Sequence, residues 1–196
     1  MANEELVEIV RQGRKAVASW RRKNPEVVVD LVDADLTEVD LAGVNLRRSQ
    51  MVGAKLTRSR LTGANFSGAD LTRADLAAAE VSRVNFSAAR LFRAKLQEIR
   101  GERVDFGRAV LQGADLSGAV LSEACFADAE LQETDLAGAE LLGVNFSHTD
   151  LDHVNFERVG CGWSFWNDVD DDVFRQLVSE KNTWYKGRTC SSSTIS

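Results

Sequence analysis

Large apolar residues recur at every fifth position between Leu31 and Phe156. The pattern runs through 26 consecutive units without an insertion, and only Gly101 among these positions lacks an apolar side chain. We number each unit so that this residue is position 0. Position −2 is alanine in 14 units and valine in 7, whereas positions −1 and +1 are mostly polar. This alternation is typical of a β-strand that points two side chains inward in every unit.

Position +2 indicates where the chain turns. Strict strand alternation would point this position inward as well, yet it is arginine or glycine in many units, as at Arg48 and Arg73. A charged side chain is not stable in a core without a partner. We therefore predict a turn near positions +1 and +2 of every unit. A helix is excluded because a period of five does not stay on one helical face.

A second period, four units long, predicts a four-sided coil. Aromatic residues follow it at every twentieth position, at Phe66, Phe86, Phe106, Phe126, Phe146 and Trp166. Outward charges alternate in sign at the same spacing, in the series Lys55, Asp75, Lys95, Asp115 and in the series Arg60, Glu80, Arg100. Coils of four units would stack the aromatic rings in one column and place opposite charges on neighbouring strands. We expect about seven such coils with a filled interior that leaves no internal ligand cavity.

The flanking segments are interpreted as caps for the open ends of this rod. An amphipathic helix is predicted over 3–23, with Asn3 as its N-cap and Asn24-Pro25 as its end. Beyond the repeat, the apolar residues from Val173 to Val178 indicate a short helix. The predicted organisation is a capping helix, the repeat, a C-terminal cap with a short helix, and a disordered tail, at residues 1–24, 25–166, 167–186 and 187–196.

Several units resemble the pentapeptide repeat, A-(D/N)-(L/F)-X-X. Ala-Asn-Phe-Ser-Gly at 64–68, Ala-Asp-Leu-Thr-Arg at 69–73 and Ala-Asp-Leu-Ser-Gly at 114–118 carry the likeness. The resemblance covers roughly 29–166 and implies an all-β solenoid, a right-handed quadrilateral β-helix. Gly101 departs from the repeat, and we interpret the neighbouring Ile99 as filling part of the space that it leaves. Some members of this family resemble B-form DNA, bind DNA gyrase or topoisomerase IV, and protect against quinolones; others look like binding modules.

Composition indicates a folded protein, the N-terminus and the cysteines indicate the cytoplasm, and the scaffold that we expect is of bacterial type. Of its 196 residues 44% are hydrophobic, but no apolar run is long enough to span a membrane. Glu4, Glu5 and Glu8 are unlike the start of a signal peptide. Three scattered cysteines fit a reducing compartment, and the net charge of −6 argues against nucleic acid as a direct partner. We expect neither a membrane nor a nucleic-acid partner.

No motif predicts catalysis, and we expect no enzyme, cofactor or metal. Walker, dinucleotide-binding, nucleophile-elbow and paired-cysteine motifs are missing from the sequence. We interpret Cys161, at position 0, as a core residue, Cys125 as an outward residue, and Cys190 as part of the tail. His148 and His153, one unit apart at position +2, are interpreted as exposed turn residues. A shared metal is the alternative, but a zinc site needs three or four close ligands.

Charge divides the repeat into two halves. Residues 47–108 hold 13 Lys or Arg and 6 Asp or Glu, whereas residues 109–157 hold 10 Asp or Glu and no Lys or Arg. The candidate partner surface is this acidic half, with the residues Asp115, Glu123, Asp128, Glu130, Glu133, Asp135, Glu140, Asp150 and Asp152.

Three interpretations of the acidic half are open. It is a solvated surface, a DNA-like surface, or one side of a contact between copies of the chain. The basic half and the uninterrupted register count against DNA mimicry along the whole rod. The predicted function is a non-catalytic scaffold that binds an unidentified protein, and the alternative is a DNA-mimicking protein that binds gyrase or topoisomerase. Self-association through the ends of the rod is a further expectation.

Overall fold

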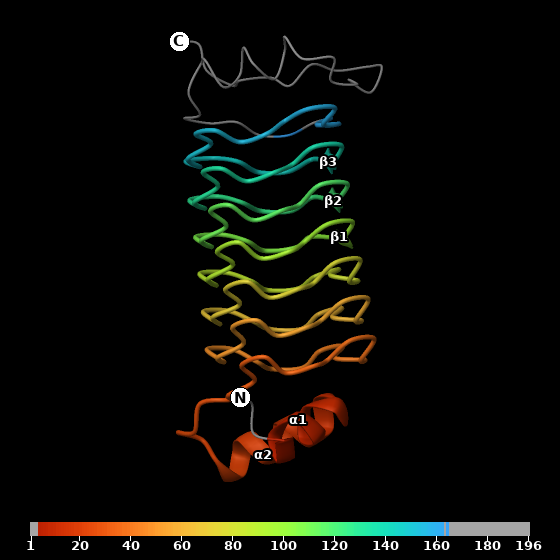
Figure 1. The fold of residues 1–196 in the computed structure, drawn as a ribbon, viewed down its shortest axis with the longest axis vertical. Coiled ribbons are helices and arrows are strands. Elements are labelled where there is room, and N and C mark those ends of the chain that lie inside the picture. The colour runs from red at the N-terminus through yellow and green to blue at the C-terminus, as the bar shows by residue number, and fades with distance from the viewer. Residues whose placement is uncertain (1–3, 163, 165–196) are drawn as a thin grey trace.

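Residues at every twentieth position lie side by side in neighbouring coils of the chain. The computed structural model describes residues 4–162 and 164, and parallel β-bridges repeat at this spacing from Asp30↔Gln50 to Glu140↔Gly160. Figure 1 shows the resulting stack of coils. Three short strands, β1 (Arg100–Glu102), β2 (Val120–Ser122) and β3 (Glu140–Leu142), pair in parallel with the same register. The predicted coil length of four units is confirmed.

Most units end in a turn at the predicted place, and at three corners of one edge the strands β1, β2 and β3 replace it. The N–H of Ala34, for example, donates to the Leu31 carbonyl at 3.0 Å. Position +2 has a positive φ in all 26 units, and 18 of these residues are not glycine. Arginine side chains at this position therefore leave the coil at its corners. Four such corners in every coil, each with a positive φ at position +2, give it four sides.

Because the turn requires a left-handed backbone, Gly138→Ala should lower the free energy of unfolding by about 1 kcal/mol. Gly138 has a φ of +67°, and no heavy atom lies within 4 Å of the position that a Cβ would take, so backbone strain is the only expected cost. The reverse change, Ala88→Gly at a φ of 53°, should raise the free energy of unfolding. Chemical denaturation followed by circular dichroism measures both. Equal stabilities in the two variants would contradict this account of the turn.

Asparagine and aspartate at position −1 fix the start of each turn. Their Oδ1 atoms accept the N–H of position +1, as Asp40 does from Ala42 at 3.0 Å and Asn65 from Ser67 at 2.9 Å. The N–H of Ala42, and then the Arg60 guanidinium, lower the pKa of the Asp40 carboxyl. These interactions therefore stabilise the fold above the pKa of the unfolded chain, and their contribution is lost as the pH falls through the folded pKa. The frequency of Asp and Asn at this position thus has a structural cause.

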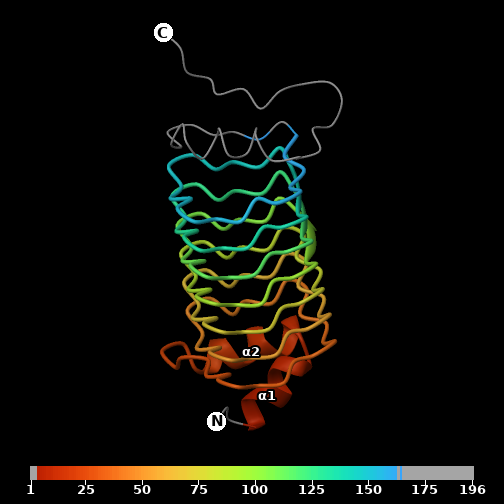
Figure 2. The same ribbon diagram turned by 45° about the horizontal axis from the view of Figure 1, so that its top comes forward.

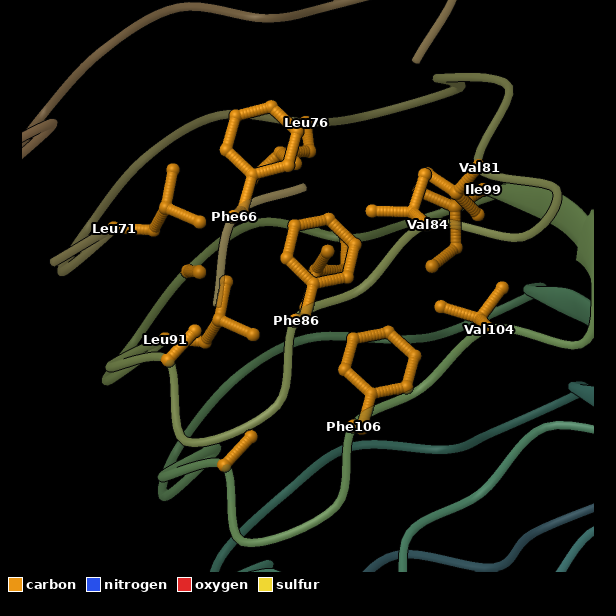
Figure 3. Packing of buried hydrophobic residues seen from close by; sticks show 14 of the residues in the cluster. Phe66, Leu71, Leu76, Val81, Val84, Phe86, Leu91, Ile99, Val104 and Phe106 are labelled. Carbon is orange, nitrogen blue, oxygen red and sulfur yellow. The ribbon is translucent and has the colours of Figure 1, made fainter. Parts of the chain in front are cut away.

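The interior is filled by the residues at positions 0 and −2. Five phenylalanines stack in one column from Phe66 to Phe146, with ring centroids 4.8–5.3 Å apart and planes within 16° of parallel. Figure 3 shows part of this column beside its aliphatic neighbours. The predicted aromatic column is confirmed over these five rings, while Trp166 lies outside the described residues. Cys161 is buried, as predicted, and Cys125 is partly exposed at its outward position.

Two helices lie at the N-terminal end of the stack (Figures 1 and 2), where the sequence predicts one. They are α1 (Glu4–Arg11) and α2 (Arg14–Lys23). Gly13 separates them with a φ of +79°, which an α-helix does not allow. Val10 and Val17 belong to the hydrophobic core. Neither described helix has the length and the apolar run that a bilayer-spanning segment needs. The predicted N-cap Asn3 and the predicted C-terminal cap, helix and tail lie outside the described residues.

Arginines of both helices donate hydrogen bonds to backbone carbonyls of the first coil. Arg11 Nη2 donates to the Asp35 carbonyl at 2.9 Å. Arg21 Nε donates to the Asn45 carbonyl at 2.7 Å, and its Nη2 donates to the Arg47 carbonyl at 3.0 Å. These carbonyls belong to the end of the stack, where no preceding coil lies. The helices therefore satisfy backbone acceptors as well as covering apolar side chains.

Candidate interaction surface

Outward residues at every twentieth position form columns along the rod. Side A is the column of Asp30, Gln50, Asp70, Arg90, Val110, Glu130 and Asp150. Side B is the column of Asp35, Lys55, Asp75, Lys95, Asp115, Asp135 and Asn155. The turn residues between them form edge AB, which includes Arg73, Arg93, Gly113, Glu133, Asp152 and His153. Sides A and B are therefore adjoining faces of the same rod.

Six of the nine predicted acidic residues lie together on these two sides and their shared edge. We call this set the acidic surface: Asp115, Glu130, Glu133, Asp135, Asp150 and Asp152. The other three predicted residues are elsewhere. Glu140 is on the side opposite side A, and Glu123 and Asp128 occupy two other turns. The sequence thus identified the acidic half, and the coil register separates its members into one group and three outlying residues.

Two of the outlying acidic residues are already paired. Glu123 contacts Arg103 at 2.7 Å, and Asp128 contacts Arg108 at 3.7 Å, in each case one coil below. The hydrogen bond from Arg103 to Glu123 raises the pKa of that guanidinium. These carboxylates are compensated within the rod, so they contribute less negative potential to a partner than the acidic surface does.

The lower coils, which are those nearer the N-terminus, follow the predicted alternation of charge. Eight bridged pairs that start before residue 100 join two charged residues, and all eight have opposite signs. Asp70 and Arg90 approach to 3.8 Å, and Asp75 and Lys95 approach to 3.5 Å. Each exposed pair of this kind contributes about 0.2–1 kcal/mol. The alternation predicted for the Lys55 and Arg60 series is confirmed as register.

Charge in the upper coils breaks this rule. The two bridged pairs of charged residues that start after residue 100 are Asp115↔Asp135 and Glu130↔Asp150, and both place acid opposite acid. In residues 4–162 and 164, no Lys or Arg forms an ion pair with Glu130, Glu133 or Asp152. Apart from Asp115, which faces Lys95 on its N-terminal side, the acidic surface is therefore a stack of like charges without opposite charges from the neighbouring coils.

Side-chain amides, in place of cations, donate hydrogen bonds to three aspartates of the acidic surface. Gln97 Nε2 donates to Asp115 at 2.6 Å, Gln132 Nε2 donates to Asp150 at 2.6 Å, and Asn155 Nδ2 donates to Asp135 at 3.0 Å. These bonds orient the aspartates but leave their charge unchanged. Sequence reasoning missed these donors because it followed charged residues along the columns and left the amides out, although each donor lies 18 or 20 residues from its acceptor.

The histidines lie where the sequence placed them. His148 and His153 are exposed turn residues with φ values of 56° and 58°. In the described part of the chain, no group of three or more His, Cys, Asp or Glu side chains is arranged to hold a metal ion.

Two hollows lie at the other end of the rod, beside the helices. One of about 460 Å³ lies between α1 and the first coil, where Val7, Arg11 and Asp35 line it. Another, of about 600 Å³, is lined by residues of both helices, including Leu6, Ile9 and Trp20. Neither touches the acidic surface. The second hollow is lined by both helices, whereas the sequence predicts a single helix here.

Comparison with known proteins identifies a family and solved structures that are similar to this chain. The family described as "Pentapeptide repeats" matches in eight copies, over residues 30–68, 69–100, 102–136 and 129–159. Full-length QnrB1, a plasmid-mediated fluoroquinolone resistance protein, is 17% identical with a TM-score of 0.70, over 80% of each chain. A trypsin-treated QnrB1 variant is 18% identical with the same TM-score, over 80% of this chain and 79% of that one. A search among curated proteins found no match. The likeness supports a right-handed β-helix, and at this identity it concerns the fold alone.

Proposed function

Because the chain belongs to the pentapeptide repeat family, we propose that it is a non-catalytic scaffold of the bacterial cytoplasm that binds a protein partner. The partner is positively charged and lies on the acidic surface. About seven coils form the rod, and α1 and α2 close its N-terminal end. The filled interior supports this proposal, because side chains such as Leu76, Phe86 and Leu116 are fully buried and leave the outer faces for binding.

The observation that carries the proposal is the change of charge pattern along the rod. A repeat selected only for stability would continue to alternate sign between coils, as the lower coils do. Acid opposite acid, at Asp115↔Asp135 and Glu130↔Asp150, destabilises the rod and favours a cationic partner that screens both charges. The acidic surface thus has a cost in stability that binding would offset.

This cost can be measured with Glu130→Lys. The new ammonium would face Asp150 across the coils, so we expect the free energy of unfolding to rise by about 0.5–1 kcal/mol in dilute protein at low salt. The matched control is Lys95→Glu, which would face Asp75 and Asp115 and should lower it by a similar amount. Chemical denaturation measures both variants. A destabilised Glu130→Lys protein would show that the stacked acids do not repel one another.

Binding can be tested by capture of proteins from an extract of the source cells. The test variant carries Glu130→Gln and Glu133→Gln, and the control carries Glu80→Gln and Glu140→Gln on the side opposite side A, so both lose two charges. We expect a partner that is captured by the wild type and the control and lost by the test variant. Equal capture by all three proteins would contradict binding through the acidic surface.

A second candidate function is that of a DNA-mimicking protein that binds gyrase or topoisomerase. It is favoured by carboxylates that recur along two adjoining sides at the spacing of the coils, about 4.8 Å. The continuous register from Asp30 to Gly160 and the basic lower coils weigh against it. A gyrase supercoiling assay at micromolar protein, with and without a quinolone, tests it. Inhibition or protection that is lost in the Glu130→Gln/Glu133→Gln variant would support it, and unchanged supercoiling would exclude it.

A further inference from the structure

We propose that a second copy of this chain binds antiparallel along edge AB, with the acidic half of each copy against the basic half of the other. The inference rests on the proposed scaffold function and deepens it, because it names one partner of the acidic surface. Two sets of residues carry it. The basic triad is Arg90, Arg93 and Lys95, and the acidic triad is Glu130, Glu133 and Asp135.

The two triads occupy equivalent positions two coils apart. Each basic residue is followed two coils later by an acidic one: Arg90 by Glu130, Arg93 by Glu133, and Lys95 by Asp135. One pair lies on side A, one on edge AB and one on side B. The coil between the triads contains residues 110–115. The two triads therefore carry opposite charges and lie on either side of this central coil, each about 5 Å from it along the rod.

Two copies related by a two-fold axis at the central coil present complementary charges to each other. The axis lies perpendicular to the rods and reverses their direction, so side A of one copy meets side A of the other, and side B meets side B. The basic triad of each copy then faces the acidic triad of the other. Three opposite-charge pairs form, and the symmetry repeats them, which gives six. A parallel copy in register would instead place like charges against one another.

Five of the six side chains in the two triads are exposed, and the sixth, Asp135, is half-buried and accepts a hydrogen bond from Asn155. Glu130 and Glu133 have no ion-pair partner in the described residues, and Arg93 has none either, although its guanidinium lies 5.1 Å from the centre of the Phe92 ring. Arg90 and Lys95 contact Asp70 and Asp75 at 3.8 and 3.5 Å, and their side chains are 69% and 61% exposed. Ion pairs this long and exposed leave both cations able to contact a second carboxylate.

The central coil offers little steric obstruction to the approach. Gly113, on edge AB, has no side chain, and Val110 and Gln112 are half-buried. The next coils outward are less complementary: Arg73 would meet His153 of the other copy, next to Asp152, whereas Asp70 would meet Asp150. The attraction is thus concentrated on three coils. Because this small interface depends on charge, we expect its affinity to fall as the salt concentration rises.

Sedimentation equilibrium of the full chain tests the association. We expect dimers in the micromolar range at about 0.02 M salt and their dissociation at about 0.5 M salt. Reversing the basic triad to glutamate should weaken the dimer at least about tenfold, and so should reversing the acidic triad to lysine. An equimolar mixture of the two variants should dimerise again, because opposite charges then face one another between the two proteins. Recovery in the mixture also shows that both variants fold. A monomer at low salt, or a dimer that neither reversal weakens, would overturn the proposal.

Cysteine cross-linking tests the orientation. The background carries Cys125→Ser and Cys190→Ser. In it, Gln112→Cys lies beside the two-fold axis and should form a disulfide with the same cysteine of the second copy on mild oxidation. Val120→Cys is the matched control, since it lies near the central coil on the side opposite side A. Cross-linking of the control and not of Gln112→Cys would overturn the antiparallel arrangement.

Failure of the dimer is distinguishable from failure of the scaffold. The variant with the basic triad changed to glutamate has an intact acidic surface. It should therefore still capture a cationic partner protein, whether or not the dimer forms. Loss of that capture in the Glu130→Gln/Glu133→Gln variant concerns the scaffold alone.

Discussion

Replacing Phe106 with alanine is expected to lower the free energy of unfolding by about 3–5 kcal/mol. Phe106 is fully buried in the middle of the aromatic column, 5.2 Å from Phe86 and 4.8 Å from Phe126 between ring centroids. Its neighbours belong to coils whose spacing is fixed by backbone hydrogen bonds, so they cannot close the cavity that the ring would leave. Chemical denaturation followed by circular dichroism measures the change.

The conservative control at this position is Phe106→Leu. Leucine occupies position 0 in most coils of the other three columns, and we expect this change to cost below about 1.5 kcal/mol. A cost below about 1 kcal/mol for Phe106→Ala would contradict the packing of the column. Equal costs for the two variants would show that the loss does not come from the cavity.

The second large effect is expected where the repeat is broken. Gly101→Ala should lower the free energy of unfolding by about 2–3 kcal/mol, although it brings the residue closer to the apolar consensus. A Cβ at Gly101 would lie 2.8 Å from the backbone carbon of Val81 and from the backbone nitrogen of Ser82. These backbone atoms form part of the coil below and cannot move independently. Equilibrium unfolding of the variant tests this expectation.

Gly107→Ala is the control for Gly101→Ala. A Cβ at Gly107 would meet the side-chain Oδ1 of Asp105 at 3.0 Å, and a side chain can rotate away. We expect a smaller loss of stability than at Gly101. A Gly101→Ala protein as stable as the wild type would show that the coils do not approach as closely as the structure has them.

Gly101 also corrects the prediction made from the sequence. The missing side chain suggests a space that Ile99 fills in part, but the backbone of Val81 lies only 2.8 Å from the position that a Cβ would take. Gly101 lies in β1, where the corner changes from the turn of the coil below to a short parallel strand. The sequence period shows that position 0 is exceptional here, but the close approach depends on the coil below.

The register itself is predictable because it rests on two periods that agree. Position 0 at every fifth residue defines the unit, and phenylalanine at every twentieth defines the coil, as the stacking from Phe66 to Phe146 confirms. Opposite charges at the same spacing are independent support, and Asp75 and Lys95 indeed lie together. Such periods are strong signals because each coil repeats the same contacts.

The helices and the grouping of the acidic residues are less predictable. Apolar spacing over 3–23 fits one helix, and the break depends on the single backbone conformation of Gly13. Composition identifies the nine acidic residues, yet which of them are compensated depends on cations one coil away, such as Arg103 beside Glu123. Stacked acids such as Glu130 and Asp150 become visible only when the coil register is applied to the charges.

The most direct test of a cationic partner on the acidic surface is capture from the source cells by three proteins. They are the wild type, Glu130→Gln/Glu133→Gln, and the charge-matched Glu80→Gln/Glu140→Gln. The account predicts a basic protein that binds the wild type and the matched control and is lost when Glu130 and Glu133 are neutralised. Capture of the same proteins by all three, or of none by the wild type, would contradict it.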